Sequence, residues 1–154
     1  MWCVAGLAGS RREPAMIAAV RSRAIIIHEL AHARAALQAA AATGVTLELW
    51  SAPGAAAYAG AGWFDALVRR ATAENPAASV VAVLDCADRA DLVQAALRQG
   101  LLQLCYRGAP ETARRLADIA RQYGATLHRK MPLALDLLHV DDPFAACRAW
   151  LGSD

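Results

Sequence analysis

The sequence lacks long apolar runs, clustered basic residues and plentiful aromatic residues, and each absence excludes a class of protein. No uninterrupted apolar stretch approaches the ~20 residues that a membrane-spanning helix needs, so we expect no membrane span. The net charge is only +2, with acids and bases interspersed, so no basic face predicts a nucleic-acid partner. Aromatic residues make up only 6% of the chain and do not alternate with arginines, which argues against a surface for stacking bases.

The cysteines also follow no motif. They form no C-x-x-C pair and lie far apart, at Cys3, Cys86, Cys105 and Cys147. A disulfide framework is therefore not expected, and reduced thiols suit a cytoplasmic protein.

The first 22 residues are interpreted as an extension ahead of the domain. Arg11-Arg12 and the short apolar stretch after them are similar to a twin-arginine export signal. That stretch is closed by Arg21 and Arg23, however, and is shorter than the ~7–15 residues of a secretory apolar region. We therefore expect residues 1–22 to be a poorly ordered N-terminal extension and residues 23–154 to form a single α/β domain.

From residue 24 onward, short apolar runs alternate with helical patterns. The predicted strands are 24–27, 45–50, 79–84, 101–105 and 125–128. The predicted helices cover 30–43, 63–73, the segment between Asp88 and Gly100, 111–123, and a last segment opened by Asp142-Pro143. Glycines 44, 100 and 124 are expected to end three of these helices in the left-handed conformation, and Asp88 is expected to cap the helix after it.

Strands alternating with helices predict parallel pairing through right-handed crossovers. Five such units in about 130 residues favour a three-layer α/β fold: an open parallel five-stranded sheet, flavodoxin-like, with helices on both faces. Because 45–50 alternates apolar with polar residues, it is predicted to be an edge strand. Residues 54–62 are interpreted either as a glycine-hinged mobile loop or as an ordinary connection. The stretch 131–140 shows no clear pattern.

Ligands bind beyond the carboxyl ends of the strands in open parallel sheets, so side chains at those positions are the candidate site residues. The residues at or just after the predicted strand ends are His28, Glu29, Trp50, Ser51, Asp85, Cys86, Asp88, Cys105, Tyr106, Arg107 and His128. The set that we favour for ligand binding is His28, Trp50, Ser51, Asp85, Asp88 and Arg107.

Three of these positions also have side chains with catalytic chemistry, namely Glu29, Asp85 and Cys86, although no complete catalytic set can be identified. Asp85 follows a buried strand, where a carboxylate either takes part in catalysis or caps the following loop. Cys86 could act as a nucleophile with His28 as its base, or join Cys105, His28 and His128 as four zinc ligands. The alternative is that both cysteines are small buried core residues.

Residues 28–32 spell H-E-x-x-H. This motif resembles that of the zincin metallopeptidases, and the resemblance covers these five residues and the apolar flank 25–27. It implies a zinc ion bound by His28 and His32, with Glu29 taking a proton from metal-bound water. The flank 25–27 is a better strand than helical turn, however. The alternative therefore places His28 and Glu29 in a loop and His32 in the first turn of the helix.

The leading hypothesis is a small cytoplasmic α/β domain that binds a small ligand or a protein partner at the carboxyl edge of its sheet, without catalysis and without a cofactor. No G-K-[ST] loop is present, so a nucleotide phosphate site is not predicted. Alanine-rich stripes on the outer helices make a homo-oligomer a further expectation. The alternative function is a zinc-dependent hydrolase that uses residues 28–32.

Overall fold

The computed structural model describes residues 23–152, so the predicted extension at residues 1–22 lies outside the described residues. The strands are β1 (Ala24–Ile27), β2 (Leu47–Ser51), β3 (Val80–Asp85), β4 (Gln103–Cys105), β5 (Thr126–His128) and β6 (Ala134–Asp136). The helices are α1 (Leu30–Thr43), α2 (Ala55–Tyr58), α3 (Ala61–Glu74), α4 (Ala90–Arg98), α5 (Pro110–Gln122) and α6 (Pro143–Gly152).

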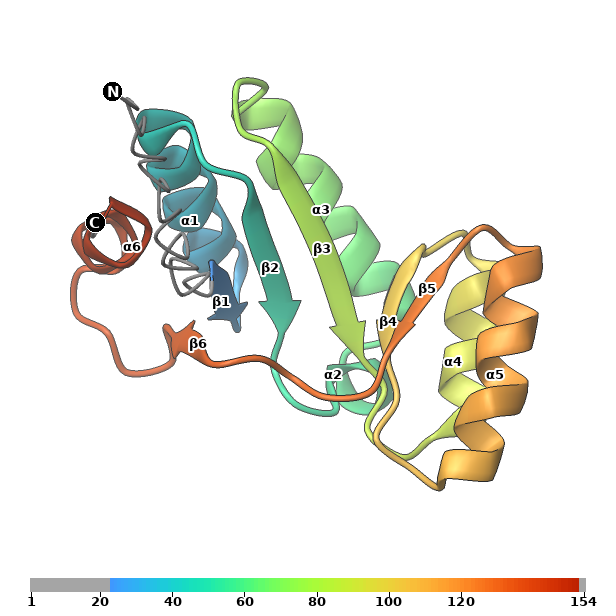
Figure 1. Cartoon of the computed structure of the whole chain (residues 1–154). Coiled ribbons are helices and arrows are strands. Elements are labelled where there is room, and N and C mark those ends of the chain that lie inside the picture. The colour runs from blue at the N-terminus through green and yellow to red at the C-terminus, as the bar shows by residue number, and fades with distance from the viewer. Residues whose placement is uncertain (1–22, 153–154) are drawn as a thin grey trace, which may run out of the picture.

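The strands form one six-stranded sheet in the order β5-β4-β3-β2-β1-β6, and every pairing is parallel. The predicted α/β class with an open, flavodoxin-like parallel sheet is therefore confirmed, with six strands instead of five (Figure 1). The additional strand, β6, comes from the stretch 131–140 that shows no clear sequence pattern. The predicted position of β2 at an edge is wrong, because β2 pairs with β1 on one side and β3 on the other.

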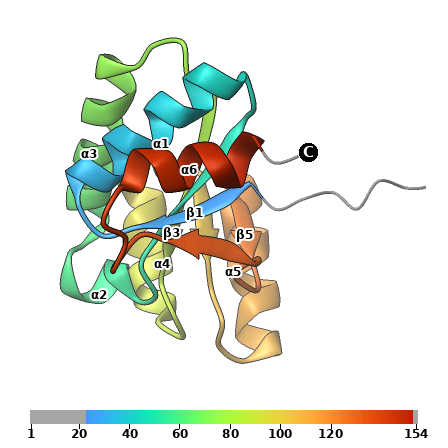
Figure 2. The same cartoon turned by 90° about the vertical axis from the view of Figure 1, so that its left-hand side faces the viewer.

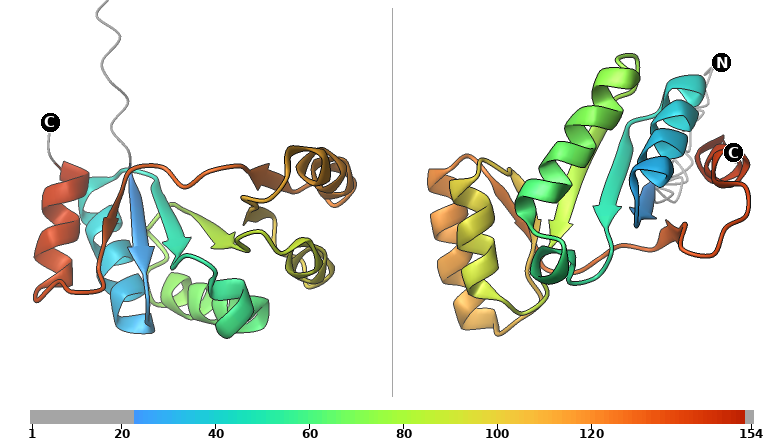
Figure 3. Two further views of the ribbon diagram at one scale, coloured as in Figure 1. Left: turned by 90° about the horizontal axis from the view of Figure 1, so that it is seen from below. Right: turned by 180° about the vertical axis from the view of Figure 1, so that it is seen from behind.

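The described helices gather on one face of the sheet, which corrects the prediction of helices on both faces. Strands β1 to β5 occupy consecutive positions, and right-handed crossovers that always step in the same direction place their helices on the same side. Residues from α1, α3, α4, α5 and α6 share one core with Ile25 and Leu84. Figure 3, seen from below, shows the helices on one side and the β5–β6 connection passing along the other.

A smaller core covers the opposite, helix-free face. It contains Trp50 and Val83, and Met131 of the β5–β6 connection packs against it. None of its described members lies in a helix. This face therefore depends on the connection, rather than on a helix layer, for its cover.

The chain crosses from one edge of the sheet to the other between β5 and β6 without forming a helix (Figure 1), and Figure 2 shows β6 lying beside β1. Strand β6 then pairs in parallel with β1, with Ala24 opposite Ala134, and the N–H of Leu137 donates to the carbonyl of Ile26 at 3.1 Å. Helix α6 follows and packs against α1. This return path brings Asp136 to the carboxyl end of β1.

Several local predictions concern how helices begin and end. Gly44, Gly100 and Gly124 have φ angles of +70°, +89° and +69°, so the predicted left-handed helix ends are confirmed. The predicted cap at Asp88 is wrong: Arg89 precedes the first residue of α4, and no side chain caps this helix. The glycine-flanked segment 54–62 contains the short helix α2 and the first turn of α3 instead of an open loop.

Candidate functional site

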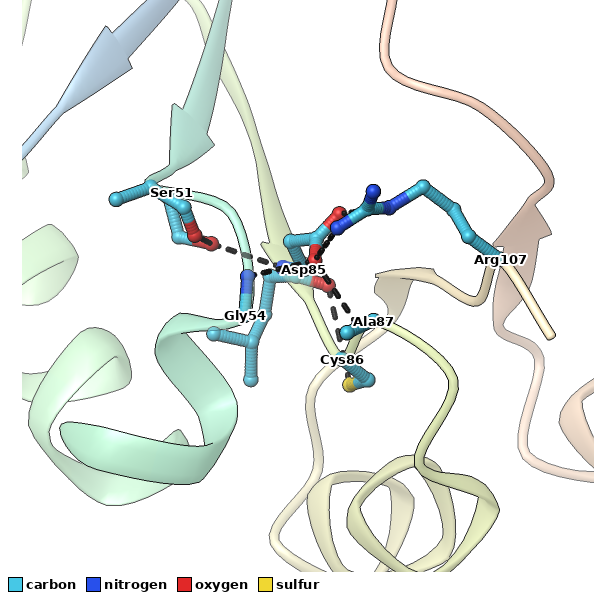
Figure 4. A network of polar contacts seen from close by, with 8 residues as sticks. Ser51, Gly54, Asp85, Cys86, Ala87 and Arg107 are labelled. Atoms are coloured by element: carbon cyan, nitrogen blue, oxygen red, sulfur yellow. Dashed lines mark hydrogen bonds and ion pairs between the residues drawn. The ribbon is translucent and has the colours of Figure 1, made fainter.

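Asp85 ends β3 and is the centre of a buried polar network at the carboxyl edge of the sheet (Figure 4). Its side chain is fully buried. The Oδ1 atom accepts hydrogen bonds from the backbone N–H groups of Gly54 at 2.8 Å and Ala87 at 2.9 Å. The backbone N–H of Asp85 in turn donates to Ser51 Oγ at 2.8 Å. The loops after β2 and β3 therefore meet at this one residue, and the loop after β4 joins them there.

The third loop contributes Arg107, which binds the same carboxylate with two nitrogens. Its Nε lies 3.1 Å from Oδ2 of Asp85 and its Nη2 lies 3.0 Å from Oδ1. These hydrogen bonds raise the pKa of Arg107, so the guanidinium stays charged. Its side chain is 42% exposed, and Nη1 has no partner among the described residues. Arg107 thus presents one fixed, accessible donor at the edge of the sheet.

Two loop residues adopt left-handed backbone conformations to reach Asp85. Gly54 has φ +70°, which costs glycine little, whereas Ala87 has φ +52°, which is unfavourable for a residue with a side chain. Both conformations aim an N–H at the carboxylate. The four donors occupy both oxygens of Asp85 and leave them little room to contact a ligand, so a stabilising role fits it better than a catalytic one.

The thiols next to this network are buried. Burial, followed by the charge of Asp85, raises the pKa of both Cys86 and Cys105 to about 12. Thiols with such pKa values are almost entirely protonated at neutral pH and therefore poor nucleophiles. This geometry supports the interpretation of Cys86 and Cys105 as small core residues.

A second pair of side chains lies at the end of β1. His28 Nε2 is 2.6 Å from Oδ1 of Asp136, which also accepts a hydrogen bond from the N–H of Leu138 at 3.0 Å. Burial raises the pKa of Asp136, but the hydrogen bonds from Leu138 and His28 outweigh that effect and hold this pKa below its ordinary value. The other ring nitrogen of His28, Nδ1, has no partner among the described residues. The Asp136 contact therefore leaves Nδ1 as the ring nitrogen available for a ligand.

Asp136 is a member of this site that was not identified from the sequence. A weak signal exists, because Leu133, Leu135 and Leu137 alternate with Ala134 and Asp136 at the two-residue period of a strand. The contact with His28 joins residues 108 positions apart, which no local pattern reveals.

The H-E-x-x-H residues do not share one regular helical face. Helix α1 begins at Leu30, and Glu29 precedes it in an extended conformation. The alternative interpretation is therefore confirmed: His28 and Glu29 lie in the loop and His32 lies in the first turn. In residues 23–152, no group of three or more His, Cys, Asp or Glu side chains is placed to hold a metal ion.

The contacts of His32 indicate a structural role rather than a metal-binding one. Its Nδ1 accepts a hydrogen bond from the backbone N–H of His28 at 3.2 Å, and its Nε2 lies 3.6 Å from a carboxylate oxygen of Glu29. Burial lowers the pKa of His32, against the opposing charge of Glu29, which favours the neutral ring. His32 therefore holds the loop that carries His28 in place.

Trp50 and His128 lie on the helix-free face. The Trp50 indole is 1% exposed and donates to Oε2 of Glu48 at 3.2 Å, while its ring packs edge-on against His128 at 5.5 Å between centroids. The imidazole of His128 is bonded to Gln103 at 2.8 Å. Trp50 is thus a core residue here rather than an accessible wall of a pocket.

The structure brings some of the predicted site residues together and separates others. Ser51, Asp85 and Arg107 form one network, whereas Asp88 is exposed beyond it. His28, which directly follows β1, lies beside Asp136 of β6, and Ile27 of β1 is paired with Ser51 of β2. Since neighbouring strands lie ~4.8 Å apart, the ends of β1 and β3 are separated by about 10 Å.

No protein-family model matches the sequence, and no curated protein matches it. None of the helices between residues 23 and 152 combines the length and apolarity that crossing a membrane requires.

Proposed function

We propose that the protein binds a small polar ligand at the carboxyl edge of its sheet, without catalysing its conversion. The observation that carries this proposal is the pair of fixed polar groups that face solvent at that edge. Within residues 23–152, Nδ1 of His28 has no partner while Asp136 holds its ring, and Nη1 of Arg107 has no partner while Asp85 holds its guanidinium. Binding sites commonly place a few oriented polar groups in this way.

The chemistry of these two groups indicates the kind of ligand. Nδ1 of His28 can form a hydrogen bond with a hydroxyl or amine on the ligand. The guanidinium of Arg107 suits a carboxylate, phosphate or carbonyl oxygen. A molecule with both kinds of group would span the edge from the end of β1 to Asp85 at the end of β3, where Arg107 is held.

A role in binding is favoured over catalysis because two of the three catalytic candidates, Asp85 and Cys86, are already engaged or unreactive. The carboxylate of Asp85 accepts four hydrogen bonds from the protein, and the thiol of Cys86 has a pKa of about 12. Cys86, Cys105 and Cys147 are also free thiols, which suits the reducing conditions of a cytoplasmic protein.

Nuclear magnetic resonance titration tests the proposal directly. The full chain, labelled with ¹⁵N, is titrated with a panel of hydroxy-dicarboxylates, amino acids and sugar phosphates, and the imidazole and backbone signals are followed. We expect at least one class to shift the signals of His28 and Arg107, and we expect His28→Ala and Arg107→Gln each to weaken binding by roughly tenfold or more.

Arg98→Gln is the matched control, because Arg98 lies in the last turn of α4 at the opposite end of the sheet. Shifts that persist in a His28→Ala, Arg107→Gln double variant, or a panel without any binder at this edge, would contradict the proposed function.

A further inference from the structure

Helix α5 has a side that no other element within residues 23–152 covers. Each earlier helix has the next βα unit beside it, but the chain leaves β5 directly for β6 at the far edge of the sheet. Helix α4 is the only described helix that packs closely against α5, and β5 is the last strand on that side. The place where another helix would continue the layer is therefore open, as the right panel of Figure 3 shows at the outer side of α5.

A groove lies in that place, between α5 and β5. Its volume is about 460 Å³, and its lining residues are Pro110, Ala113, Arg114, Ala117, Leu127 and Arg129. Ala113 and Ala117 are four residues apart and so occupy the same face of α5, beside Leu127 of β5. Small side chains on this face allow another helix to approach closely. The floor is thus apolar and shallow, with arginines at its rim.

The two rim arginines have no acidic partner among the described residues, as is also the case for Arg98 and Arg115. No acidic residue lines the groove. Other helical arginines at the surface do form ion pairs, as Arg69 does with Asp65. The groove therefore carries an uncompensated positive rim.

Arg129 is also held in a fixed position. Its Nη2 donates to the carbonyl oxygen of Gly108 at 2.9 Å, and its guanidinium carbon lies 5.6 Å from the centroid of the Tyr106 ring. A prearranged guanidinium loses less conformational freedom when it pairs with a partner.

We propose that this groove is the docking site for an amphipathic helix of another protein. The apolar stripe of that helix lies against Ala113, Ala117 and Leu127, and acidic side chains along its flanks pair with Arg114 and Arg129. We infer acidic flanks on the partner because the rim of the groove is positively charged. We infer a helical partner because the groove lies where another helix would continue the layer. Neither His28 nor Arg107 lines this groove, although Arg129 contacts the loop that carries Arg107.

A pair of designed peptides tests the proposal against the full chain. Each has about 18 residues, or five helical turns, with leucine and alanine at the i, i+3, i+4 and i+7 positions. One peptide carries glutamates on both flanks and the other carries lysines. By fluorescence anisotropy we expect the glutamate peptide to bind at least roughly tenfold more tightly than the lysine peptide.

Two variants test whether the preference for the glutamate peptide depends on the groove. In Arg114→Glu, Arg129→Glu, we expect the preference to reverse in favour of the lysine peptide. In Ala117→Leu, which fills the floor at a half-buried position, we expect the glutamate peptide to lose roughly tenfold or more in affinity. The matched control is Arg98→Glu, Arg115→Glu, which makes the same change of charge outside the groove.

Equal affinity for the two peptides, or the same effect in the control as in the groove variant, would overturn the proposal. Concentration-dependent dimerisation of the unmodified chain that Ala117→Leu abolishes would overturn it as well, because a second copy would then occupy the groove. Circular dichroism of each variant verifies that it is folded.

Discussion

Arg107 and Asp85 form an ion pair in which the carboxylate is completely buried and the guanidinium is 42% exposed. Among the ion pairs of the described residues, no other has a fully buried carboxylate. The pair links the loop after β4 to the end of β3, and Asp85 further holds the loop after β2 through Gly54. It therefore joins three of the loops that form the proposed ligand site.

The first prediction concerns this pair. Arg107→Ala leaves the charge of Asp85 buried with only two backbone donors, so we expect the free energy of unfolding to fall by about 1.5–3 kcal/mol at neutral pH. Arg107→Lys restores one charged donor and is expected to lose less. Urea unfolding followed by circular dichroism measures both, and Arg98→Ala should lie within about 0.5 kcal/mol of the unmodified chain. An Arg107→Ala chain as stable as that control would show that the pair has no net stabilising effect.

The fold class was predictable from the sequence because its signals are local. Apolar β-branched runs such as Ala24–Ile27 and left-handed glycines such as Gly44 identify strands and helix ends within a few residues. The placement of helices on one face was not predictable in this way. It follows from the strand order, which depends on pairings between segments far apart in the chain.

The candidate site was likewise predictable only where local sequence signals identify its residues. Ser51, Asp85 and Arg107 could be identified because each directly follows a recognisable strand. Asp136 was missed because β6 has three residues and obtains its position from pairing with β1. Trp50 was placed at a pocket because its position at a strand end is a local signal, whereas its burial depends on the cover from His128 and Met131.

The second prediction concerns thiol reactivity. Burial raises the pKa values of Cys86, Cys105 and Cys147 to about 12, so we expect all three thiols to react at pH 8 at least about 100-fold more slowly in the folded chain than in urea. A Cys3→Ser background removes the thiol that lies outside the described residues. The measurement uses 5,5′-dithiobis(2-nitrobenzoate), with mass spectrometry of digested samples to assign each site. Rapid labelling of Cys86 in the folded chain, ahead of Cys147, would instead indicate an activated thiol.

The third prediction concerns pH. Burial lowers the pKa values of His32 and His128 below the ordinary value of 6.5, against the opposing charges of Glu29 and Glu48 respectively. Around and below pH 6.5 the unfolded chain therefore binds protons that the folded chain resists, so the free energy of unfolding falls as the pH drops through 6.5 toward the lowered pKa values. Asp136, whose pKa is lowered from 3.8, contributes its own loss of stability only at pH values near and below that number.

A pair of substitutions isolates the histidine contribution. His32→Asn keeps an acceptor for the N–H of His28, and His128→Gln keeps an amide to bond with Gln103. We expect the double variant to show a shallower dependence of unfolding free energy on pH between about 5 and 6.5. Urea unfolding at a series of pH values measures that slope. A slope identical to that of the unmodified chain would mean that neither histidine is protonated more readily in the unfolded state.

The fourth prediction concerns metal. The Nε2 atom of His28 is engaged by Asp136, and Nδ1 of His32 is engaged by the backbone, so both histidines of the H-E-x-x-H motif have other partners. We therefore expect protein purified without chelators or a histidine tag to contain well below one zinc per chain by elemental analysis. We also expect added zinc to leave the melting temperature unchanged, because a metal that binds only the folded state would raise it. Near-stoichiometric zinc that is lost in His32→Ala but retained in Glu29→Ala would restore the hydrolase hypothesis. It would also require the contact between His28 and Asp136 to rearrange around the ion, a change that the imidazole ¹⁵N signals of His28 would report.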